Sequence, residues 1–343
     1  MHCFCSILML SYKSSNKGGT RMDLQYTLER FALQLKNQRR TLNRVARVFQ
    51  KIMKTLYEHH FPNAEAHRPG PNPNCRDADI LTVAWLLEYI GEDSENSGYR
   101  RLKAELKTVF PNLPERSRFN RRRRNLASAS EVLRRTLTPD LSKTDVFIVD
   151  SFPMPVCDFK RAKTSKSDLK WADGTGTYAT YGHCETKGLG TFFSFRCSLI
   201  TTSLGVPVDF CLTAANRDDR AVLPHLAERG EYPILLGDKG YISEALQVEL
   251  METEGTVLLP TLKRNQKHQY PDDFRPLQVR IRRRIETTIG QLTEQFHIAR
   301  VRALKHWGVR TRMSNKMGSC VLGAFVNQCL GRPLMKLKDL VLA

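Results

Sequence analysis

Residues 145–150 read DVFIVD, a short apolar run that ends in a carboxylate, and this stretch decides the fold of the second half of the chain. Such a run is typical of a strand buried in the interior of a sheet. Residues 232–238, YPILLGD, have the same character and also end in an aspartate. Two strands of this kind predict an α/β layered domain.

More strands and helices are expected around these two. Residues 191–202 and 206–213 are rich in β-branched and aromatic residues, and Ser203-Leu204-Gly205 between them predicts a hairpin. The order βββαβαβα that results predicts a mixed sheet with helices. The remaining expected elements are helices over 219–229, 243–254 and about 277–300, and a strand over 256–260.

Residues 22–140 predict an all-helical, basic module. Apolar residues recur at spacings of three and four over residues 23–57, which is the period of one helix face. After a Pro-rich linker at 62–74, helical patterns resume at Asp79 and around Tyr99.

The last helix of this module is expected to carry a run of arginines. Pro111 and Pro114 frame a turn, and Ser117 is a favourable N-cap for the next helix. Two helices, a short turn and a basic third helix resemble a helix-turn-helix with a recognition helix. For any one arginine, a solvent-facing role or a generic phosphate contact is an equal alternative. The expected DNA contacts are Arg116, Arg118, Arg121, Arg122, Arg123 and Arg124.

Composition limits the class of protein and its partner. A length of 343 residues suggests about two domains. The net charge of +19 favours a polyanionic partner, either nucleic acid or an anionic membrane surface. No stretch approaches the roughly 18 apolar residues of a membrane-spanning helix.

The cysteines and the N-terminus indicate a cytoplasmic protein. Nine cysteines are scattered without a C-x-x-C pair, which fits reduced thiols better than a zinc site or a disulfide framework. Residues 1–21 are a poor signal peptide and are expected to form a disordered tail.

Asp150 and Asp238 each follow one of the two buried strands. Ligands of open α/β sheets gather at the carboxyl ends of strands, so these aspartates converge if the strands are parallel and adjacent. Gly237 lets the backbone approach a ligand, and residues 239–241 (KGY) follow directly. For either aspartate alone, a turn former or a helix N-cap is the more common role.

A third carboxylate, Glu286, lies at the border of the apolar stripe of the long helix. Its alternative role is an i, i+4 pair with Arg282, worth roughly 0.2–0.5 kcal/mol. Three carboxylates from distant parts of the chain suit two divalent cations. A spare acid, Asp219, is expected to cap its own helix. Four arginines crowd the turn beside Glu286, and a phosphodiester bound next to a metal site would require such positive charge. They are Arg280, Arg282, Arg283 and Arg284.

These motifs resemble those of the DDE-type bacterial insertion-sequence transposases, in particular insertion sequence family 982. The matching motifs are VDSFP at Asp150, GDKGY at Asp238 and R-x-x-x-E-x-x-x-x-Q-L at Glu286, with intervals of 88 and 48 residues between the acids. The stretches RSRFNRRRR (116–124) and RMSNKMGSCVLGAFVNQ (312–328) also resemble that group, and the likeness extends over about residues 22–340.

The resemblance implies a ribonuclease-H-like catalytic domain that uses two Mg²⁺ ions, for which Mn²⁺ substitutes. Asp150 would bridge both ions, Asp238 would hold one and Glu286 the other, while Arg282 would hold a phosphate. The chain departs from the pattern in the second strand, where Arg196 and Ser198 replace a lysine and a histidine. It also departs around Glu286, where relatives carry a tyrosine and a lysine: here these positions are Val279 and Thr293.

Other basic residues are expected to contact DNA. The long connection at residues 160–190 mixes lysines and arginines with Trp171, Tyr178 and Tyr181, which suits single-stranded or distorted DNA ends. A flexible loop with incidental aromatics is the equal alternative. The catalytic region adds Lys239, Arg282 and Arg283 to the expected DNA contacts.

The sequence therefore predicts a Mg²⁺-dependent transposase, a homodimer in its synaptic complex, that acts in the bacterial cytoplasm at the nucleoid. Residues 22–140 would bind terminal inverted repeats, residues 141–312 would form the catalytic domain, and residues 313–343 would pack on that domain as a C-terminal helix. The partners are the repeats and the target DNA, and no membrane is expected. Two alternatives stay open: a nuclease without strand transfer, and an inactive or repurposed DNA-binding protein.

Overall fold

The structure is a computed structural model that describes residues 18–64, 73–92, 94–141, 144–157, 159–164, 166–184 and 190–341. The expected tail at 1–21 and the Pro-rich linker at 62–74 lie largely outside these residues. The described chain divides into two compact units. The sheet unit contains residues 144–293 and 298–306, and the helical unit contains residues 18–141, 294–297 and 307–341.

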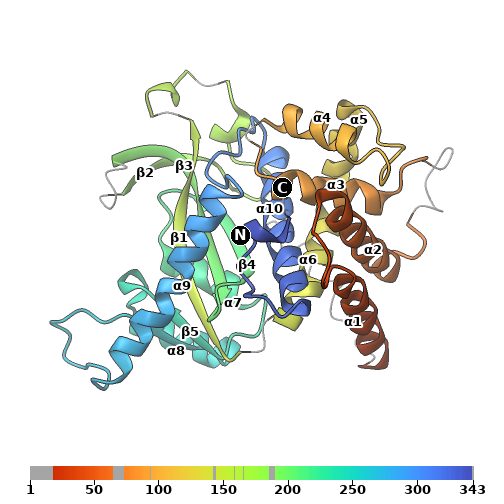
Figure 1. The fold of residues 1–343 in the computed structure, drawn as a ribbon. Helices are drawn as coiled ribbons and strands as arrows, with labels where there is room; N and C mark the ends of the chain where they lie inside the picture. Colours follow the sequence, from red (N-terminus) through yellow and green to blue (C-terminus); the bar gives the residue numbers. More distant parts are fainter. Residues whose placement is uncertain are drawn as a thin grey trace. The chain divides into compact units, whose positions relative to one another are not determined.

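The sheet unit is built on a mixed sheet, which within the described residues has six strands (Figure 1). The strand order is β2-β3-β1-β5-β6, and β4 pairs with the part of β3 that β2 leaves open. The strands are β1 (Val146–Cys157), β2 (Thr180–Cys184), β3 (Gly190–Thr202), β4 (Pro207–Ala214), β5 (Ile234–Gly237) and β6 (Val257–Pro260). The predicted α/β class with a mixed sheet is confirmed.

Two helices cover one face of this sheet. These are α7 (Asp219–Ala227) and α8 (Glu244–Glu254), whose apolar residues form one buried cluster with Phe147, Val149 and Leu235. Because side chains alternate along a strand, Ile148 and Asp150 of β1 point to the opposite face. The apolar stretches predicted as strands are thus buried on both faces.

The opposite face is covered by α9 (Phe274–Glu294). The buried Gln278 donates a hydrogen bond from Nε2 to the Leu259 carbonyl at 2.9 Å, and the Thr288 hydroxyl donates to the Gly205 carbonyl at 2.7 Å. These contacts fix the helix along its length against the ends of β4 and β6.

The predicted order of elements is confirmed, with three differences. The first strand does not end at Asp150, because β1 continues to Cys157. The segment expected as a long connection contains β2, which pairs antiparallel with the first residues of β3. The long helix ends at Glu294 rather than near Arg300, because the chain turns at His297, which has a φ of 48°, and the Ile298 N–H bonds back to the Leu292 carbonyl.

The helical unit consists of seven helices among its described residues. They are α1 (Gly18–Leu33), α2 (Leu42–His60), α3 (Asp77–Tyr89), α4 (Glu95–Glu105), α5 (Arg116–Asn125), α6 (Ala127–Leu141) and α10 (His306–Cys329). Helix α3 is buried over almost its whole length. The Trp85 indole within it donates to the Ser130 hydroxyl of α6 at 2.9 Å, so α3 is the core of this unit.

Two boundaries in this unit differ from the sequence prediction. The continuous helical pattern over 23–57 is two helices, separated by a turn that includes Asn37 at a φ of 58°. The basic helix begins at Arg116 with Glu115 at its N-cap, so the prediction of Ser117 as the N-cap is wrong. Periodicity alone did not reveal the turn because apolar spacing continues across it.

The C-terminal helix groups with the helical unit, whereas the sequence analysis placed residues 313–343 with the catalytic domain. Gly318 explains this grouping, because a Cβ atom there would lie 2.4 Å from the Trp85 ring. The glycine therefore lets α10 approach α3 closely. Further along the chain, the Tyr89 hydroxyl donates to the Leu337 carbonyl.

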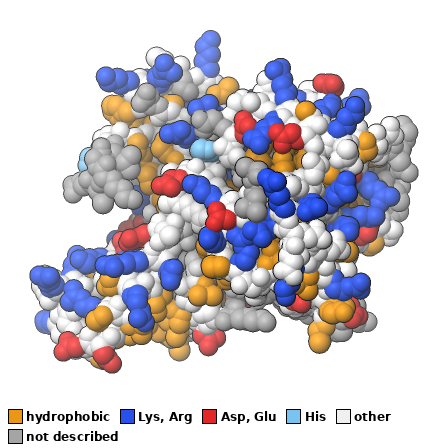
Figure 2. Space-filling model, in the orientation of Figure 1, with side chains coloured by type: hydrophobic (Ala, Val, Ile, Leu, Met, Phe, Trp, Pro, Cys, Tyr) orange, Lys and Arg blue, Asp and Glu red, His pale blue; other side chains and the backbone are white. Residues whose placement is uncertain are grey.

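The surface is strongly basic. Figure 2 shows Lys and Arg side chains spread across the visible face in clear excess over Asp and Glu, as the net charge of +19 requires. No helix in the described part of the chain is both long enough and apolar enough to cross a membrane.

Candidate active site

The register of β1 and β5 brings two predicted acids to one edge of the sheet. The strands are parallel neighbours, with Ile148 opposite Leu236. Asp150 lies two residues further along β1, which continues to Cys157, and Asp238 directly follows β5, so the two aspartates lie just beyond the last parallel pair of these strands. The condition for the two aspartates to converge, that their strands are parallel and adjacent, is thus met.

The two glycines of the GDKGY motif allow the backbone to turn sharply after β5. Asp238 accepts a hydrogen bond through Oδ1 from the Gly240 N–H at 2.8 Å and caps a short 3₁₀ turn. A Cβ atom at Gly240 would lie 2.9 Å from that oxygen, and one at Gly237 would lie 2.9 Å from the Tyr241 ring. Asp238 thus has one oxygen bound to the backbone and the other available to a ligand.

Asp150 is held in an environment that disfavours its negative charge. Burial is the main cause that raises its pKa to about 6, and repulsion from Asp238 and Asp219 adds to it. The Ser151 N–H, which donates to Oδ1 at 2.8 Å, and the Arg282 guanidinium oppose this shift. A cation bound beside Asp150 would therefore stabilise its ionised form.

Asp219 joins these two aspartates, which the sequence analysis did not foresee. The N-cap of α7 is Asp218, whose carboxylate accepts from the Arg220 N–H at 2.9 Å, so the prediction that Asp219 caps its own helix is wrong. Asp219 Oδ2 instead accepts from Arg196 of β3 at 2.8 Å and from Ser151 of β1 at 3.0 Å. Two adjacent acids before a helix were the available signal, since only one can occupy the N-cap.

Tyr241 is buried beneath the three aspartates. Burial is the main cause that raises its pKa well above the usual value, and the charges of Asp219, Asp150 and Asp238 raise it further. Its hydroxyl and Asp219 Oδ1 are both buried without a hydrogen-bond partner among the described residues. The carboxylate cluster is therefore only partly satisfied by hydrogen bonds among the described residues.

Glu286 is not brought to this cluster. Its side chain is exposed on α9, beside Ile285, whose own side chain faces the core. Asp150 has electrostatic partners in Asp238, Asp219 and Arg282, but Glu286 is not among them. In the part of the chain that the structure describes, no group of three or more His, Cys, Asp or Glu side chains could hold a metal ion. Of the three predicted acids, the structure thus brings Asp150 and Asp238 together and leaves Glu286 apart from them.

Arg282 does face the cluster from α9. Its Nη2 atom lies 3.9 Å from Asp150 Oδ2, and its Nη1 atom lies 3.5 Å from the Thr261 hydroxyl. Its Nε is buried without a hydrogen-bond partner among the described residues. The other two predicted contacts of this region, Arg283 and Lys239, are exposed.

The arginine run of α5 is divided between the interior and the surface of the helical unit. Arg123 is only 4% exposed, and its Nη2 atom bonds to Glu95 at 2.8 Å. Arg122 pairs with the buried Asp77 at 2.5 Å. These two guanidiniums stabilise the unit, so the expectation that they contact DNA does not fit this arrangement. The members of the run that remain exposed are Arg116, Arg118, Arg121 and Arg124.

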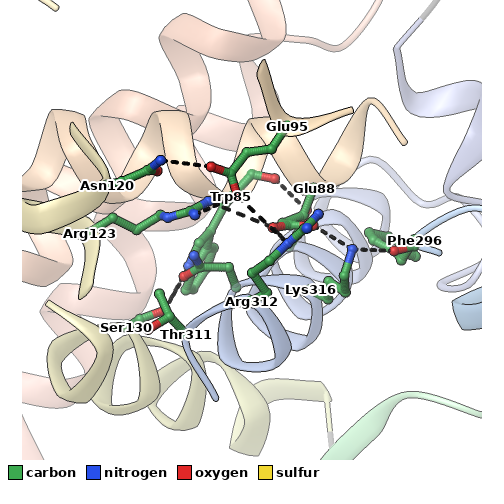
Figure 3. Close-up of polar contacts among 12 residues, drawn as sticks. Trp85, Glu88, Glu95, Asn120, Arg123, Ser130, Phe296, Thr311, Arg312 and Lys316 are labelled. Carbon is green, nitrogen blue, oxygen red and sulfur yellow. Dashed lines mark hydrogen bonds and ion pairs between the residues drawn. The ribbon is translucent and has the colours of Figure 1, made fainter. Parts of the chain in front are cut away.

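Arg123 belongs to a buried charge network that Figure 3 shows in close-up. At its centre Glu88 accepts from Lys316 at 2.5 Å and lies 3.4 Å from Arg312 Nε. Burial would raise the pKa of Glu88, but these cations and Arg123 lower it to about 2. Lys316 also donates to the Phe296 carbonyl. The network links α3, α5 and α10 to the residues that follow α9.

The segment between β1 and β3 exposes the aromatic residues expected to contact DNA. Trp171 is 73% exposed, and Tyr178 and Tyr181 are exposed as well. Tyr181 packs edge-on against Phe159, with ring centroids 5.6 Å apart. Asp173 closes a turn by accepting from the Thr175 and Thr177 N–H groups. The described part of this segment is thus ordered by local contacts, although it has little regular structure.

Comparison with known proteins gives a match, and it covers the sheet unit. No curated protein and no solved structure shows a significant match to the chain. Residues 141–306, just under half of the chain, match the family described as a transposase DDE domain. The matched stretch contains the whole sheet unit and the acids at 150, 238 and 286. This similarity supports a DDE-type transposase, and with it an enzyme that acts on DNA.

Proposed function

We propose that this protein is a DNA transposase that binds the terminal inverted repeats of an insertion sequence of the family 982 type. Water would hydrolyse a phosphodiester at each end of the element, and the 3′-hydroxyl freed there would attack a phosphodiester of the target DNA. The attack forms the new bond as the target strand breaks, so no covalent enzyme intermediate is required. Both ends must be processed together, which favours a homodimer in the active complex.

One observation carries this proposal: Asp150 and Asp238 lie just beyond the last parallel pair of β1 and β5, at the carboxyl end of β5, inside the stretch that matches a transposase DDE domain. Ligands of open α/β sheets bind at such edges. The ribonuclease-H-like class remains part of the proposal and is supported by the mixed sheet and its order of elements.

The donor set of this edge fits Mg²⁺. The cation prefers carboxylate oxygens, and Asp150 and Asp238 each have one oxygen bound to a backbone N–H and one left over. The repulsion between them is a cost that a cation would remove. Two such ions, when bound, would polarise the scissile phosphodiester and stabilise charge on the attacking and leaving oxygens. Glu286 is proposed as the third ligand on the resemblance alone.

The surrounding residues would orient the DNA strand. Arg282, whose Nη2 atom lies 3.9 Å from Asp150 Oδ2, would bind a non-bridging phosphate oxygen. Arg196 would hold Asp219 in place through their 2.8 Å ion pair. The exposed Lys239 and Arg283 would add phosphate contacts on either side.

The test is an assay of cutting and joining with the purified full chain, Mg²⁺ and a plasmid that carries the DNA flanking its own gene. Nicks should map to short inverted repeats, and a labelled 3′-hydroxyl end should become joined to a second plasmid. Asp150→Asn and Asp238→Asn should each reduce cleavage by more than the roughly 10–100-fold typical of losing an outer-shell partner. If either variant cuts as fast as the wild type, the assignment of these ligands is wrong.

A matched control directly precedes the same strand. Asp145 is exposed at the start of β1, and only its backbone carbonyl takes part in the sheet, where it accepts from the Ile234 N–H. Asp145→Asn removes the same charge from the same unit without touching the carboxyl edge. It should leave cleavage unchanged.

The exposed position of Glu286 favours one rival, an inactive or repurposed DNA-binding protein. That protein would bind the repeats but would not cut them at any concentration of Mg²⁺ or Mn²⁺. A nuclease without strand transfer would cut but would not join the labelled end. The same assay therefore separates all three functions.

A further inference from the structure

A cavity of about 560 Å³ opens in the helical unit between α4 and the start of α5. Its inner wall includes Tyr99 and Phe110, both of which are buried. The Tyr99 hydroxyl donates to the Pro114 carbonyl at 2.6 Å, and its ring packs on Phe119 with centroids 4.6 Å apart. The wall is therefore apolar and held in place by the core of the unit.

Basic side chains surround this cavity. Arg100, Lys103 and Lys107 follow one another at spacings of three and four, which places them on one side of α4 and the turn after it. Arg116 faces them from the first turn of α5, where the backbone N–H groups add partial positive charge. Four cations thus converge from two helices.

Most of this positive charge is unpaired. Among the described residues, Arg100, Lys107 and Arg116 have no acidic partner within 4 Å. Lys103 has one, the highly exposed Glu115, at 3.9 Å. The adjacent Arg101 differs sharply, because it bonds to Glu92 at 3.2 Å and to Glu105 at 2.8 Å.

The combination of unpaired cations with an apolar wall indicates which kind of ligand the cavity would bind. Mutual repulsion around a concave surface raises the local positive potential and attracts an anion. The apolar wall would cover a sugar or base edge, which an inorganic anion lacks. We propose that this cavity binds one phosphodiester unit of DNA, its phosphate on Arg100, Lys107 and Arg116 and its sugar against the Tyr99–Phe110 wall.

This proposal rests on the proposed function, because it takes DNA as the partner, and it goes further by identifying where the helical unit binds DNA. The contact surface would be α4 and the N-terminus of α5. Contacts of this kind fix the position of the duplex and carry no sequence information by themselves. Discrimination of the repeat sequence would then depend on other residues.

The experiment measures the affinity of the full chain for a fluorescently labelled DNA duplex as a function of KCl concentration. Each phosphate that the protein no longer neutralises should reduce the slope of log K against log salt by about 0.9. Because both side chains are placed on one phosphate, the double variant Arg100→Gln, Lys107→Gln should reduce the slope by about 0.9. The matched control Arg101→Gln should keep the slope of the wild type, and thermal unfolding should verify that both variants are folded.

The outcomes separate this proposal from the proposed function. An equal slope in the wild type and the double variant overturns the cavity as a DNA site, whatever the cleavage assay gives. A reduced slope in the double variant supports the cavity, even if the wild type never cuts. Calorimetric titration with deoxyadenosine monophosphate tests the free nucleotide as the source of the phosphate: micromolar binding that the double variant loses would overturn DNA as the ligand.

Discussion

The two units each contain a buried or half-buried group of charged side chains, and the groups differ in how their charge is compensated. In the sheet unit, Asp150, Asp219 and Asp238 lie together with Arg196 and Arg282 as their nearby cations. In the helical unit, the carboxylates of Glu88 and Glu95 are compensated by three cations, which are Arg123, Arg312 and Lys316.

The pKa shifts reflect this difference. Burial raises the pKa of Asp150 to about 6, and its cation does not reverse the shift. Burial acts on Glu88 in the same direction, but the surrounding cations lower its pKa to about 2. A carboxylate whose charge is left uncompensated is poised to bind a cation, whereas a fully compensated one holds the fold together. The opposite pKa shifts of Asp150 and Glu88 thus distinguish a candidate cation site from a structural charge network in the same chain.

The largest expected effect is the loss of the central carboxylate of the network. Glu88→Gln removes the carboxylate that pairs with the buried Lys316 and with Arg312. Breaking a buried pair in this way costs about 3–5 kcal/mol of unfolding free energy. Urea unfolding of the full chain measures it. Glu92→Gln, at a more exposed carboxylate of the same unit, should cost less than about 1 kcal/mol.

The acid dependence of stability should follow the same carboxylate. The pKa of Glu88 is about 2 in the folded chain and 4.5 as its ordinary value, so the unfolded chain takes up the proton first. Its contribution is therefore present above pH 4.5 and is lost as the pH falls towards 2, by about 2–3 kcal/mol. Unfolding free energies measured across this range should fall less steeply in Glu88→Gln. If the unfolding free energies of the wild type and Glu88→Gln fall equally steeply with pH, the role given to the Glu88–Lys316 pair is wrong.

Much of the fold could be predicted from the sequence because local patterns determine it. The buried strands around Asp150 and Asp238 are continuous apolar runs, and the hairpin at Gly205 has a turn signal between two β-rich stretches. The turn near Asn37 and the strand β2 were missed, since apolar spacing continues through the first and the second has a mixed polar sequence.

The candidate site was predicted less completely, because tertiary contacts decide which charges are paired. The convergence of Asp150 and Asp238 follows from strand order, and it was predicted. The position of the Asp219 side chain at the start of α7 depends on Arg196, which comes from strand β3. The inward direction of Arg123 depends on Glu88 and Glu95, and a run of arginines does not reveal which members face inward.

Two arginines of the run in α5 provide a test with a smaller expected effect, because one lies inside the buried charge network and the other lies on the surface. Arg123→Gln should lower the unfolding free energy by about 2 kcal/mol, because it breaks a charged hydrogen bond to Glu95 in the interior. Arg121→Gln, at an exposed position two residues earlier, should change it by less than about 0.5 kcal/mol. Only the second should weaken binding to a DNA duplex without loss of stability. Chemical unfolding and DNA-binding titrations of both variants check this pair.

The smallest expected effect is an increase in the unfolding free energy, whereas the preceding variants are expected to lower it. Asp150→Asn removes a charge that burial and two neighbouring aspartates disfavour, so in the presence of a chelator it should raise the unfolding free energy at pH 7 by about 1–2 kcal/mol. The same variant should lose cleavage, which would make the cluster a site maintained at the expense of stability. Adding Mg²⁺ should stabilise the wild type by the linkage between binding and folding, and should stabilise the variant less. A variant that is less stable than the wild type in chelator would mean that Asp150 supports the fold in the same way as Glu88, and the distinction between the two charged groups would then fail.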